Sequence, residues 1–337
     1  MRPRPAVLLA AFLVGCLLGL GSYALYGRLA TVPAAEVLSS PPIAGPLAGA
    51  SASPAPSAVP AVSAAPSAVP AASPAPSASA APAPSASASQ APSPSPSPTP
   101  APYDGPVTRV VPVLMYHRVA DPPPGAPYPG LYVSPASFTA QMQALHDAGW
   151  RTITAGELGA AMAEDRPVPV RTIVIMFDDG YQDNYTTAFP VLQRFGFRAT
   201  FSVVARGGST MMTSSQLAVM VRAGMEIGNH TLDHKNVASL SGPTLVQEID
   251  GGAARIEARL ASQDVTLVPT TFVYPSGHVG PAALDLLALL HYTDAFTEVP
   301  GFAVIGQTPP LEIPRVRVSR FESLAAFLAN LPTEPRP

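Results

Sequence analysis

Two histidines and two adjacent aspartates are the residues of this 337-residue sequence whose types and spacing could do metal chemistry. His230 and His234 are four residues apart in the run His-Thr-Leu-Asp-His, close enough for both imidazoles to face one ion from a helical turn or a tight loop. Two nitrogens and one carboxylate, from Asp178 or Asp179, would form a metal site with open positions for water and substrate. The pattern therefore predicts a divalent-metal centre.

The adjacent aspartates indicate how such a centre would act. Asp178 and Asp179 precede Gly180, and because successive side chains diverge, one carboxylate can bind the ion while its neighbour reaches the water that the ion activates. This division predicts an activated nucleophile with its own general base. Taken singly, Asp-Asp-Gly can be only a turn and His-x-x-x-His only part of a surface helix. A zinc protease is excluded, because the glutamate of His-Glu-x-x-His is missing.

The elements that must position these residues alternate between apolar and amphipathic runs after Pro106, which is typical of βαβα order. The predicted strands are 110–116, 151–153, 172–177, 199–204, 225–227, 271–274, 294–297 and 311–318. Predicted helices start near Ser134 with Pro135, at Thr154 with Glu157 as a capping box, at Ser214, and at Ser241 before Pro243. Apolar strands such as 172–177 indicate burial on both faces, hence a parallel barrel or a doubly wound sheet.

Polar residues fall where the predicted strands end. His117 follows the first strand, Asp178 and Asp179 follow the third, His230 lies just after the fifth, and the turn 275–277 follows the sixth. In α/β barrels the carboxyl ends of the strands build the active site. We therefore expect these four segments to converge.

Three segments carry a specific resemblance. Residues 176–180 (Met-Phe-Asp-Asp-Gly), 230–234 (His-Thr-Leu-Asp-His) and 272–277 (Phe-Val-Tyr-Pro-Ser-Gly) resemble the first three motifs of the polysaccharide deacetylase family, also called the NodB homology domain or carbohydrate esterase family 4. The resemblance covers about residues 107–332. It implies a distorted (β/α) barrel of about seven parallel strands that removes acetyl groups from N-acetylated sugars in polymers.

The resemblance also implies roles for individual residues. Matched by position, Asp178 is the catalytic base, Asp179, His230 and His234 hold the metal, Thr231 supports the metal loop, and Ser276 offers a backbone N–H to the oxyanion beside Tyr274 and Pro275 in the substrate-binding segment. The ligand set of two nitrogens and one oxygen favours Zn²⁺, although Co²⁺, Ni²⁺ or Fe²⁺ could occupy the same site.

Two departures from the family pattern affect the predicted reaction. The third motif usually begins with an arginine that orients the base, and Val273 stands there instead. The family's late histidine, which protonates the leaving amine, is also missing, because no histidine follows Asp294. Amide cleavage needs a proton donor for the leaving amine. Arg315 or Arg317 could replace the missing arginine.

A relocated motif could supply the missing histidine. Residues 113–117 (Val-Leu-Met-Tyr-His) resemble the late motif moved to the start of the domain, as in circularly permuted deacetylases that act on poly-N-acetylglucosamine. Closing a barrel places the first strand beside the last, so this relocation is geometrically reasonable. We hypothesise that His117 is the general acid; the alternative is a core or turn histidine. His278 could line the groove, whereas His146 and His291 receive no role.

The predicted function is a metal-dependent hydrolase that removes N-acetyl groups from an N-acetylglucosamine-containing extracellular or cell-wall polysaccharide. The alternatives are a non-catalytic polysaccharide-binding protein and an O-acetyl esterase on the same fold. Nucleic acid is not an expected partner, because residues 107–337 hold 16 basic and 20 acidic residues, a formal charge of about −4. The single cysteine excludes a disulfide framework and a cysteine-based zinc site.

The first 106 residues predict export and tethering. Arg2 and Arg4 precede an apolar run at 6–26 that is long enough to span a bilayer, which predicts a cytoplasmic stub and membrane helix over 1–30 with the domain outside the cell membrane. A lipoprotein modified at Cys16 and a secreted protein are the alternatives. Residues 31–106 hold 20 of the 43 prolines and predict a disordered Ala/Pro/Ser linker, followed by the domain at 107–332 and a tail at 333–337.

Overall fold

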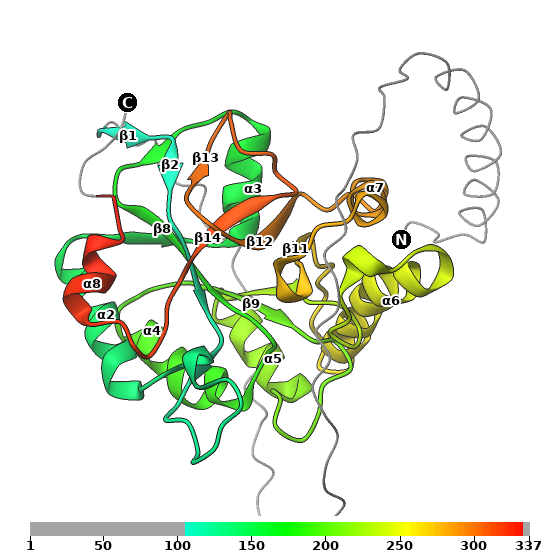
Figure 1. Cartoon of the computed structure of the whole chain (residues 1–337), viewed down its shortest axis with the longest axis horizontal. Helices are drawn as coiled ribbons and strands as arrows, with labels where there is room; N and C mark the ends of the chain where they lie inside the picture. The colour runs from blue at the N-terminus through cyan, green and yellow to red at the C-terminus, as the bar shows by residue number, and fades with distance from the viewer. Residues whose placement is uncertain (1–104, 333–337) are drawn as a thin grey trace, which may run out of the picture. The chain divides into compact units, whose positions relative to one another are not determined.

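The computed structural model describes residues 105–332, so the predictions for 1–30, for 31–104 of the linker and for 333–337 lie outside the described residues. Within them, seven parallel strands close into a barrel (Figure 1). Around the barrel their order is β3 (Val113–Tyr116), β14 (Ile313–Arg317), β12 (Asp294–Pro300), β11 (Thr271–Val273), β10 (Glu226–Asn229), β9 (Thr200–Val203) and β8 (Thr172–Phe177). The predicted α/β barrel of about seven strands is confirmed.

The barrel closes through its first strand. β3 pairs in parallel with β14, with Leu114 opposite Val316, and on its other side with β8, with Leu114 opposite Ile175. The first and last strands therefore lie side by side, as the relocated histidine requires. An eighth strand, β6 (Arg151–Ile153), pairs with the first half of β8, and β9 pairs with the end of β8.

Alternation along the strands separates the barrel interior from the outer layer. All six residues of β8 are buried, but Val174 and Met176 pack with Val113, Val273 and Ile313 inside the barrel. Their neighbours in β8 pack outward against the surrounding helices. Because side chains on a strand alternate between its two faces, residues two or four positions after these interior residues also face inward. By this rule Asp178, Arg315 and His117 point toward the barrel axis, at the carboxyl ends of β8, β14 and β3.

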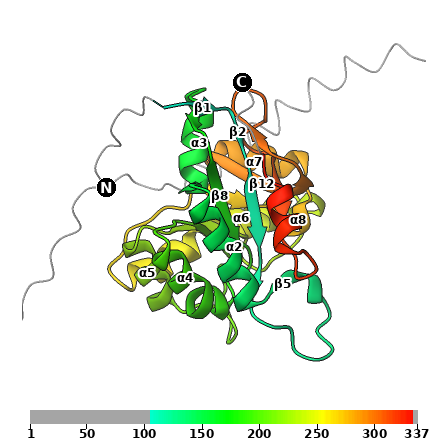
Figure 2. The ribbon, with the colours of Figure 1, turned by 90° about the vertical axis from the view of Figure 1, so that its left-hand side faces the viewer.

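Helices cover the outside of the barrel, as Figures 1 and 2 show. They are α2 (Pro135–Asp147), α4 (Phe189–Arg194), α5 (Ser214–Arg222), α6 (Gly242–Ala261), α7 (Pro281–Leu289) and α8 (Leu324–Ala329). A further helix, α3 (Ala155–Ala163), packs Leu158 and Met162 into the interior cluster. The N–H of Ala155 donates to Thr200 Oγ1 at the first residue of β9, so α3 closes the amino end of the barrel, opposite the predicted site.

Most predicted helix starts are confirmed. Ser134 and Thr154 accept hydrogen bonds from the third residue of their helices, and Thr154 forms the full capping box with Glu157. Ser241 is the N-cap of α6 but makes no side-chain cap bond. Ser214 is the first residue of α5 and its cap is Thr213, because Thr213 and Gln216 form the capping box.

The predicted strand 110–116 is broken, because Pro112 has no N–H to donate. β2 (Val110–Val111) pairs antiparallel with β13 (Ala303–Val304), and β3 alone enters the barrel. The small pairs β1 (Val107–Thr108) with β7 (Val168–Pro169) and β4 (Arg118–Val119) with β5 (Tyr132–Val133) lie outside it. Short helical turns are η1 (Pro129–Leu131), η2 (Asn184–Ala188), η3 (Val237–Ser239) and η4 (Pro275–Gly277).

No helix within residues 105–332 has the length and apolar character needed to cross a membrane. The apolar run at 6–26, on which the membrane prediction rests, is outside this range.

Candidate active site

The three predicted metal ligands lie together. Asp179 Oδ1 is 3.4 Å from His230 Nε2 and 3.3 Å from His234 Nε2. One ligand atom from each residue lies within 4.8 Å of the others. Asp179 and His230 are buried, whereas the side chain of His234 is 43% exposed. This cluster of two imidazole nitrogens and a carboxylate, open on the side of His234, can hold a divalent cation.

The backbone of the ligand loops is bent to bring these atoms together. Asp179, Thr231 and His234 all have positive φ angles, 72°, 67° and 61°, which non-glycine residues rarely adopt. Thr231 Oγ1 accepts a hydrogen bond from the His234 N–H at 2.9 Å, and Asn229 Oδ1 accepts one from the Thr231 N–H at 3.0 Å. Thr231 therefore holds the backbone of His234 in place, and Asn229 holds that of Thr231.

The His230 ring is oriented by a backbone carbonyl. Its Nδ1 lies 2.9 Å from the Val273 carbonyl oxygen, which can only accept, so Nδ1 carries a proton and Nε2 is the ring nitrogen that faces Asp179. Burial alone would raise the pKa of Asp179, but the hydrogen bonds from His230 and His234 hold it far below its usual range. Asp179 is therefore an ionised ligand, and His230 presents the nitrogen that a metal needs.

Helix α6 holds the loop between the two histidines. Glu248 is fully buried, and its carboxylate accepts from the Asp233 N–H at 2.9 Å and from Lys235 Nζ at 2.6 Å. The Leu232 N–H donates to the Glu248 carbonyl. Gly252 permits this close packing, because a Cβ there would lie 2.8 Å from Asn229 Oδ1. The sequence alone did not indicate that Glu248 belongs to the site.

The predicted base is clamped by an arginine from the last strand. Arg315 Nη1 and Nη2 each donate to one oxygen of Asp178 at 2.8 Å, and Arg315 Nε donates to the Thr297 carbonyl at 2.8 Å. Both Asp178 and Arg315 are buried. Burial would raise the pKa of Asp178, but the charge and hydrogen bonds of Arg315 outweigh burial and lower it. Of the two arginines considered, Arg315 therefore contacts the base.

Arg317 has a different partner. It pairs with Glu298 at 2.8 Å, and its side chain is 47% exposed. It lies two residues after Arg315, but it is held at the surface and not against Asp178.

His117 reaches the same centre from β3. Its Nε2 is 4.0 Å from Asp178 Oδ2, and the residue is buried. Burial, together with the charges of Arg315 and Arg317, lowers the pKa of His117 despite the opposing aspartates. The histidine is therefore at the predicted place, beside the base. Its role as the general acid stays a prediction.

Two residues that the sequence did not single out hold the segment after β3. Asp183 Oδ1 accepts from the Val119 N–H at 2.8 Å, and Asp183 Oδ2 accepts from Arg118 Nε at 2.9 Å. Asn184 Nδ2 donates to the His117 carbonyl at 2.8 Å. Both are buried at the start of the π-helical turn η2. Their spacing after the Asp-Asp-Gly motif was the available signal, but it does not say which backbone they contact.

Two tyrosines and an arginine pack together beside the ligand Asp179. The Arg118 guanidinium lies over the rings of Tyr181 and Tyr132, 4.3 Å and 5.0 Å from their centres. Burial and the neighbouring Asp179 raise the pKa of Tyr181 to about 12. Tyr181 therefore remains a neutral hydrogen-bond donor next to a ligand carboxylate.

The third-motif turn follows β11. Ser276 is exposed, with a φ of 59°, and Pro275 before it is buried. The Tyr274 side chain is fully buried and its hydroxyl donates to the Leu311 carbonyl at 2.9 Å. The predicted substrate-binding role of Tyr274 therefore does not extend to its side chain, and the exposed part of this turn is Ser276. His278 is exposed just beyond it.

The two histidines without a predicted role lie outside the ligand cluster. His146 is on α2, beside Asp147 and the Phe195 ring, and His291 follows α7 with a φ of 62°. Neither belongs to the group that could hold a metal.

A parallel barrel with an Asp-His-His cluster that could hold a metal and a buried Asp–Arg pair at the carboxyl ends of its strands has the groups that a metal-assisted hydrolase uses. The family model for polysaccharide deacetylases matches residues 165–295. "Putative polysaccharide deacetylase YxkH" of Bacillus subtilis is 31% identical over 223 residues, which cover 66% of this chain and 76% of that protein. The chain belongs to the polysaccharide deacetylase family.

Two other relatives extend the comparison. The poly-beta-1,6-N-acetyl-D-glucosamine N-deacetylase of Escherichia coli K12 is 25% identical over 260 residues, which cover 65% of this chain and 38% of that enzyme. The structure of the Streptococcus pyogenes deacetylase PplD, solved with acetate, has a TM-score of 0.61 and 24% identity, and the match covers 68% of this chain and all of PplD. PplD supports the fold assignment.

Proposed function

We propose that this protein hydrolyses N-acetyl groups on an N-acetylglucosamine-containing extracellular or cell-wall polysaccharide. The observation that carries the proposal is the buried Asp178 carboxylate, which Arg315 holds ionised next to the Asp179, His230 and His234 cluster. A base beside a metal site is what amide hydrolysis requires. The named substrate of the E. coli relative supports N-acetylglucosamine polymers as the substrate class.

The donor set fits a divalent cation. Asp179 is ionised, His230 is held in the tautomer that presents Nε2, and His234 is placed by Thr231. When bound, the cation would polarise the acetyl carbonyl and lower the pKa of a water. Two nitrogens and one oxygen favour Zn²⁺, with Co²⁺, Ni²⁺ or Fe²⁺ as substitutes.

The chain's own residues handle the protons. Asp178 accepts a proton from the attacking water, whose oxygen bonds to the acetyl carbon, while the Ser276 N–H donates to the carbonyl oxygen as it becomes negative. His117 Nε2 lies 4.0 Å from Asp178, so a small shift or one bridging water can pass that proton on. His117 then protonates the leaving nitrogen as the carbon–nitrogen bond breaks. Acetate and a free sugar amine are formed.

Arg315 and the Asp183–Asn184 pair position these two groups. The bidentate contact fixes both oxygens of Asp178 in one orientation. Asn184 holds the His117 carbonyl, and Asp183 holds the Val119 N–H that follows. The base, which follows β8, is therefore held from β14, and the segment of the acid, which follows β3, is held from the start of η2.

The sequence before the domain supports a tethered enzyme. The charged start, the apolar run at 6–26 and the Ala/Pro/Ser-rich segment at 31–106 are consistent with a domain held outside the cell membrane. A lipoprotein at Cys16 or a secreted protein would also place the domain outside. Mass spectrometry of the mature N-terminus separates the three: an intact Met1 or Arg2 supports the membrane helix, whereas a lipidated Cys16 or a later start contradicts it.

The function is tested with a panel of substrates. The full chain is stripped of metal, reloaded with Zn²⁺, and incubated with β-1,6- and β-1,4-linked N-acetylglucosamine oligosaccharides, peptidoglycan and an acetyl ester, and released acetate is measured. We expect acetate from an N-acetylated sugar. Release from the ester alone would favour an O-acetyl esterase, and no release from any substrate would favour a non-catalytic binding protein.

A further inference from the structure

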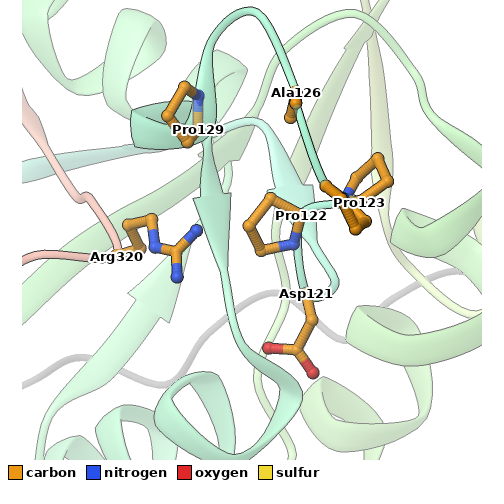
Figure 3. Close-up of a pocket in the computed structure, with 8 residues that line it drawn as sticks. Asp121, Pro122, Pro123, Ala126, Pro129 and Arg320 are labelled. Atoms are coloured by element: carbon orange, nitrogen blue, oxygen red, sulfur yellow. The ribbon is translucent and has the colours of Figure 1, made fainter.

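A pocket of about 400 Å³ is lined by the loop that follows β4 and by Arg320, which follows β14. Its volume is in the range of small-molecule sites, roughly 300–1,000 Å³. Figure 3 shows the Arg320 guanidinium directed toward the ring of Pro122, with Pro129 above and the Asp121 carboxylate below. The lining residues are Asp121, Pro122, Pro123, Pro124, Gly125, Ala126, Pro129 and Arg320.

Each wall of this pocket belongs to a segment that follows a strand of the site: one wall comes after β3, which leads to His117, and the other comes after β14, which carries Arg315. The loop 121–129 follows β4, which begins directly after His117. Arg320 follows β14, the strand of Arg315. Since β3 and β14 are hydrogen-bonded neighbours, with Arg317 opposite Met115, both walls leave the barrel at the same edge. A ligand in the pocket would therefore adjoin the catalytic centre.

Two exposed aromatic side chains belong to residues adjacent in sequence to the pocket lining. Phe321 is 76% exposed and Tyr128 is 71% exposed, and they are the two most exposed large hydrophobic side chains in residues 105–332. Phe321 follows Arg320, and its ring faces the loop at Gly130, where a Cβ would lie 3.8 Å from Phe321 Cε2. Exposed aromatic side chains on the segments that form a pocket are candidates for contacts with its ligand.

The chemistry of this surface suits a sugar ring. Pyranose rings present apolar C–H faces, which pack on aromatic rings, and hydroxyl and acetamido groups around their edges, which need donors and acceptors. Phe321 and Tyr128 supply the flat apolar faces. Arg320 supplies a fork of donors and Asp121 an acceptor. One positive and one negative group favour an uncharged glycan over a polyanion.

We propose that the pocket, with Phe321 and Tyr128, binds an N-acetylated sugar residue of the polymer next to the residue being deacetylated. This flanking subsite rests on the proposed function, because its occupant is the neighbouring part of the same substrate. It gives the enzyme a preference for polymers over short substrates. The contacts are made before and after the chemical step alike, so the subsite acts on substrate affinity.

The experiment compares long and short substrates. Phe321→Ala and Arg320→Ala variants of the Zn²⁺-loaded full chain are assayed on N-acetylglucosamine pentasaccharides and disaccharides. For each variant we expect kcat/KM on the pentasaccharide to fall about tenfold through KM, while the disaccharide value stays within about twofold. Val268→Ala, at an exposed site before β11, is the matched control and should change neither value.

Two results would overturn the subsite: unchanged pentasaccharide kinetics in both variants, or an equal loss on both substrates. Calorimetric binding of the pentasaccharide to the full chain separates the subsite from the reaction. If the wild type releases no acetate but binds the pentasaccharide, and Phe321→Ala weakens binding, the proposed function fails, and with it the flanking position, while sugar binding at the pocket stands. If acetate is released but Phe321→Ala leaves binding unchanged, the subsite fails alone.

Discussion

At the scale of single residues, the site is a set of charged groups whose burial is compensated one by one. Asp178 and Arg315 are both buried, and their two parallel hydrogen bonds offset the cost of removing each charge from water. The arginine arrives on β14 instead of at the third motif, where Val273 packs into the core. Arg315, two strands away from Val273, therefore contacts the base in place of the arginine that is missing from the third motif.

Arg315→Lys should lower kcat by about ten- to a hundredfold, because lysine keeps the charge but cannot bind both oxygens of Asp178. Zn²⁺ affinity should change little, since Arg315 contacts no ligand in the cluster. Steady-state kinetics and metal titration measure the two quantities. Arg317→Lys is the control. Wild-type kcat in Arg315→Lys would contradict the positioning role.

His117→Gln should lower kcat on an N-acetylated sugar by about a hundredfold or more, because the leaving amine loses its proton donor. The fall in kcat on an acetyl ester should be smaller, since an alkoxide leaves more readily than an amine anion. Comparing the two substrates separates acid catalysis from a structural role, which would affect both alike. Near-normal amide turnover with Zn²⁺ bound would exclude His117 as the acid.

At the scale of elements, strand ends and one helix explain why the ligands meet. The sequence predicted which strands carry polar residues at their ends, because buried parallel strands have apolar runs that polar residues interrupt visibly. It did not identify Glu248, because a glutamate on an amphipathic helix usually faces solvent. It did not place Asn184 against the His117 carbonyl either, since a contact across 67 residues leaves no local pattern.

Glu248→Gln should weaken Zn²⁺ binding by about tenfold. The neutral amide keeps the shape but loses the charged partner of Lys235, and it cannot accept from both the Asp233 N–H and Lys235 with full strength. Competition with a chromophoric chelator measures the affinity, and circular dichroism verifies the fold. Asp250→Asn on the same helix is the matched control, and equal affinities in all three proteins would rule out a role for Glu248.

At the scale of the whole molecule, the two ends of the barrel have opposite tasks. The carboxyl ends hold the site, and the amino ends hold the buried Asp294 and the half-buried Glu226 beneath α3. Asp294 Oδ1 is buried without a hydrogen-bond partner, and Gly159 of α3 packs directly on this carboxyl group. Burial and the nearby Glu226 raise the pKa of Asp294 to about 7. The folded protein therefore binds a proton here that the unfolded chain releases.

Because of this protonation, the free energy of unfolding should depend on pH. Because the pKa of Asp294 is higher in the folded than in the unfolded chain, the free energy of unfolding should decrease as pH rises from about 4 to 7, by up to about 4 kcal/mol. Asp294→Asn should remove most of that slope and be the more stable protein at pH 8. Urea unfolding of metal-free protein at pH 5 and 8 measures it, with Asp285→Asn as the exposed control. An unchanged slope in Asp294→Asn would contradict this assignment.

An α/β fold with parallel strands and a pair of metal-binding histidines could be predicted from local signals, namely apolar strands and closely spaced ligands. The choice of a barrel, and of Asp179 as the third ligand, came from the family resemblance. The closure of β3 against β14 was predicted only through the displaced histidine motif. The partner of Asp178 remained a choice between Arg315 and Arg317, which differ by two residues on one strand. Alternation does not separate them, because both have the same parity as the interior Ile313. Only the barrel shows that Arg315 contacts Asp178, whereas Arg317, at the end of β14, pairs with Glu298.

The most direct test of the central claim is a zinc titration of the metal-free full chain, with acetate release from an N-acetylglucosamine pentasaccharide as the readout. The account predicts that the rate rises linearly and stops at one Zn²⁺ per chain, and that Asp179→Asn stays inactive over the same range. One tightly bound Zn²⁺ per chain without acetate release would contradict a metal-dependent deacetylase. Equal release without metal would contradict it as well.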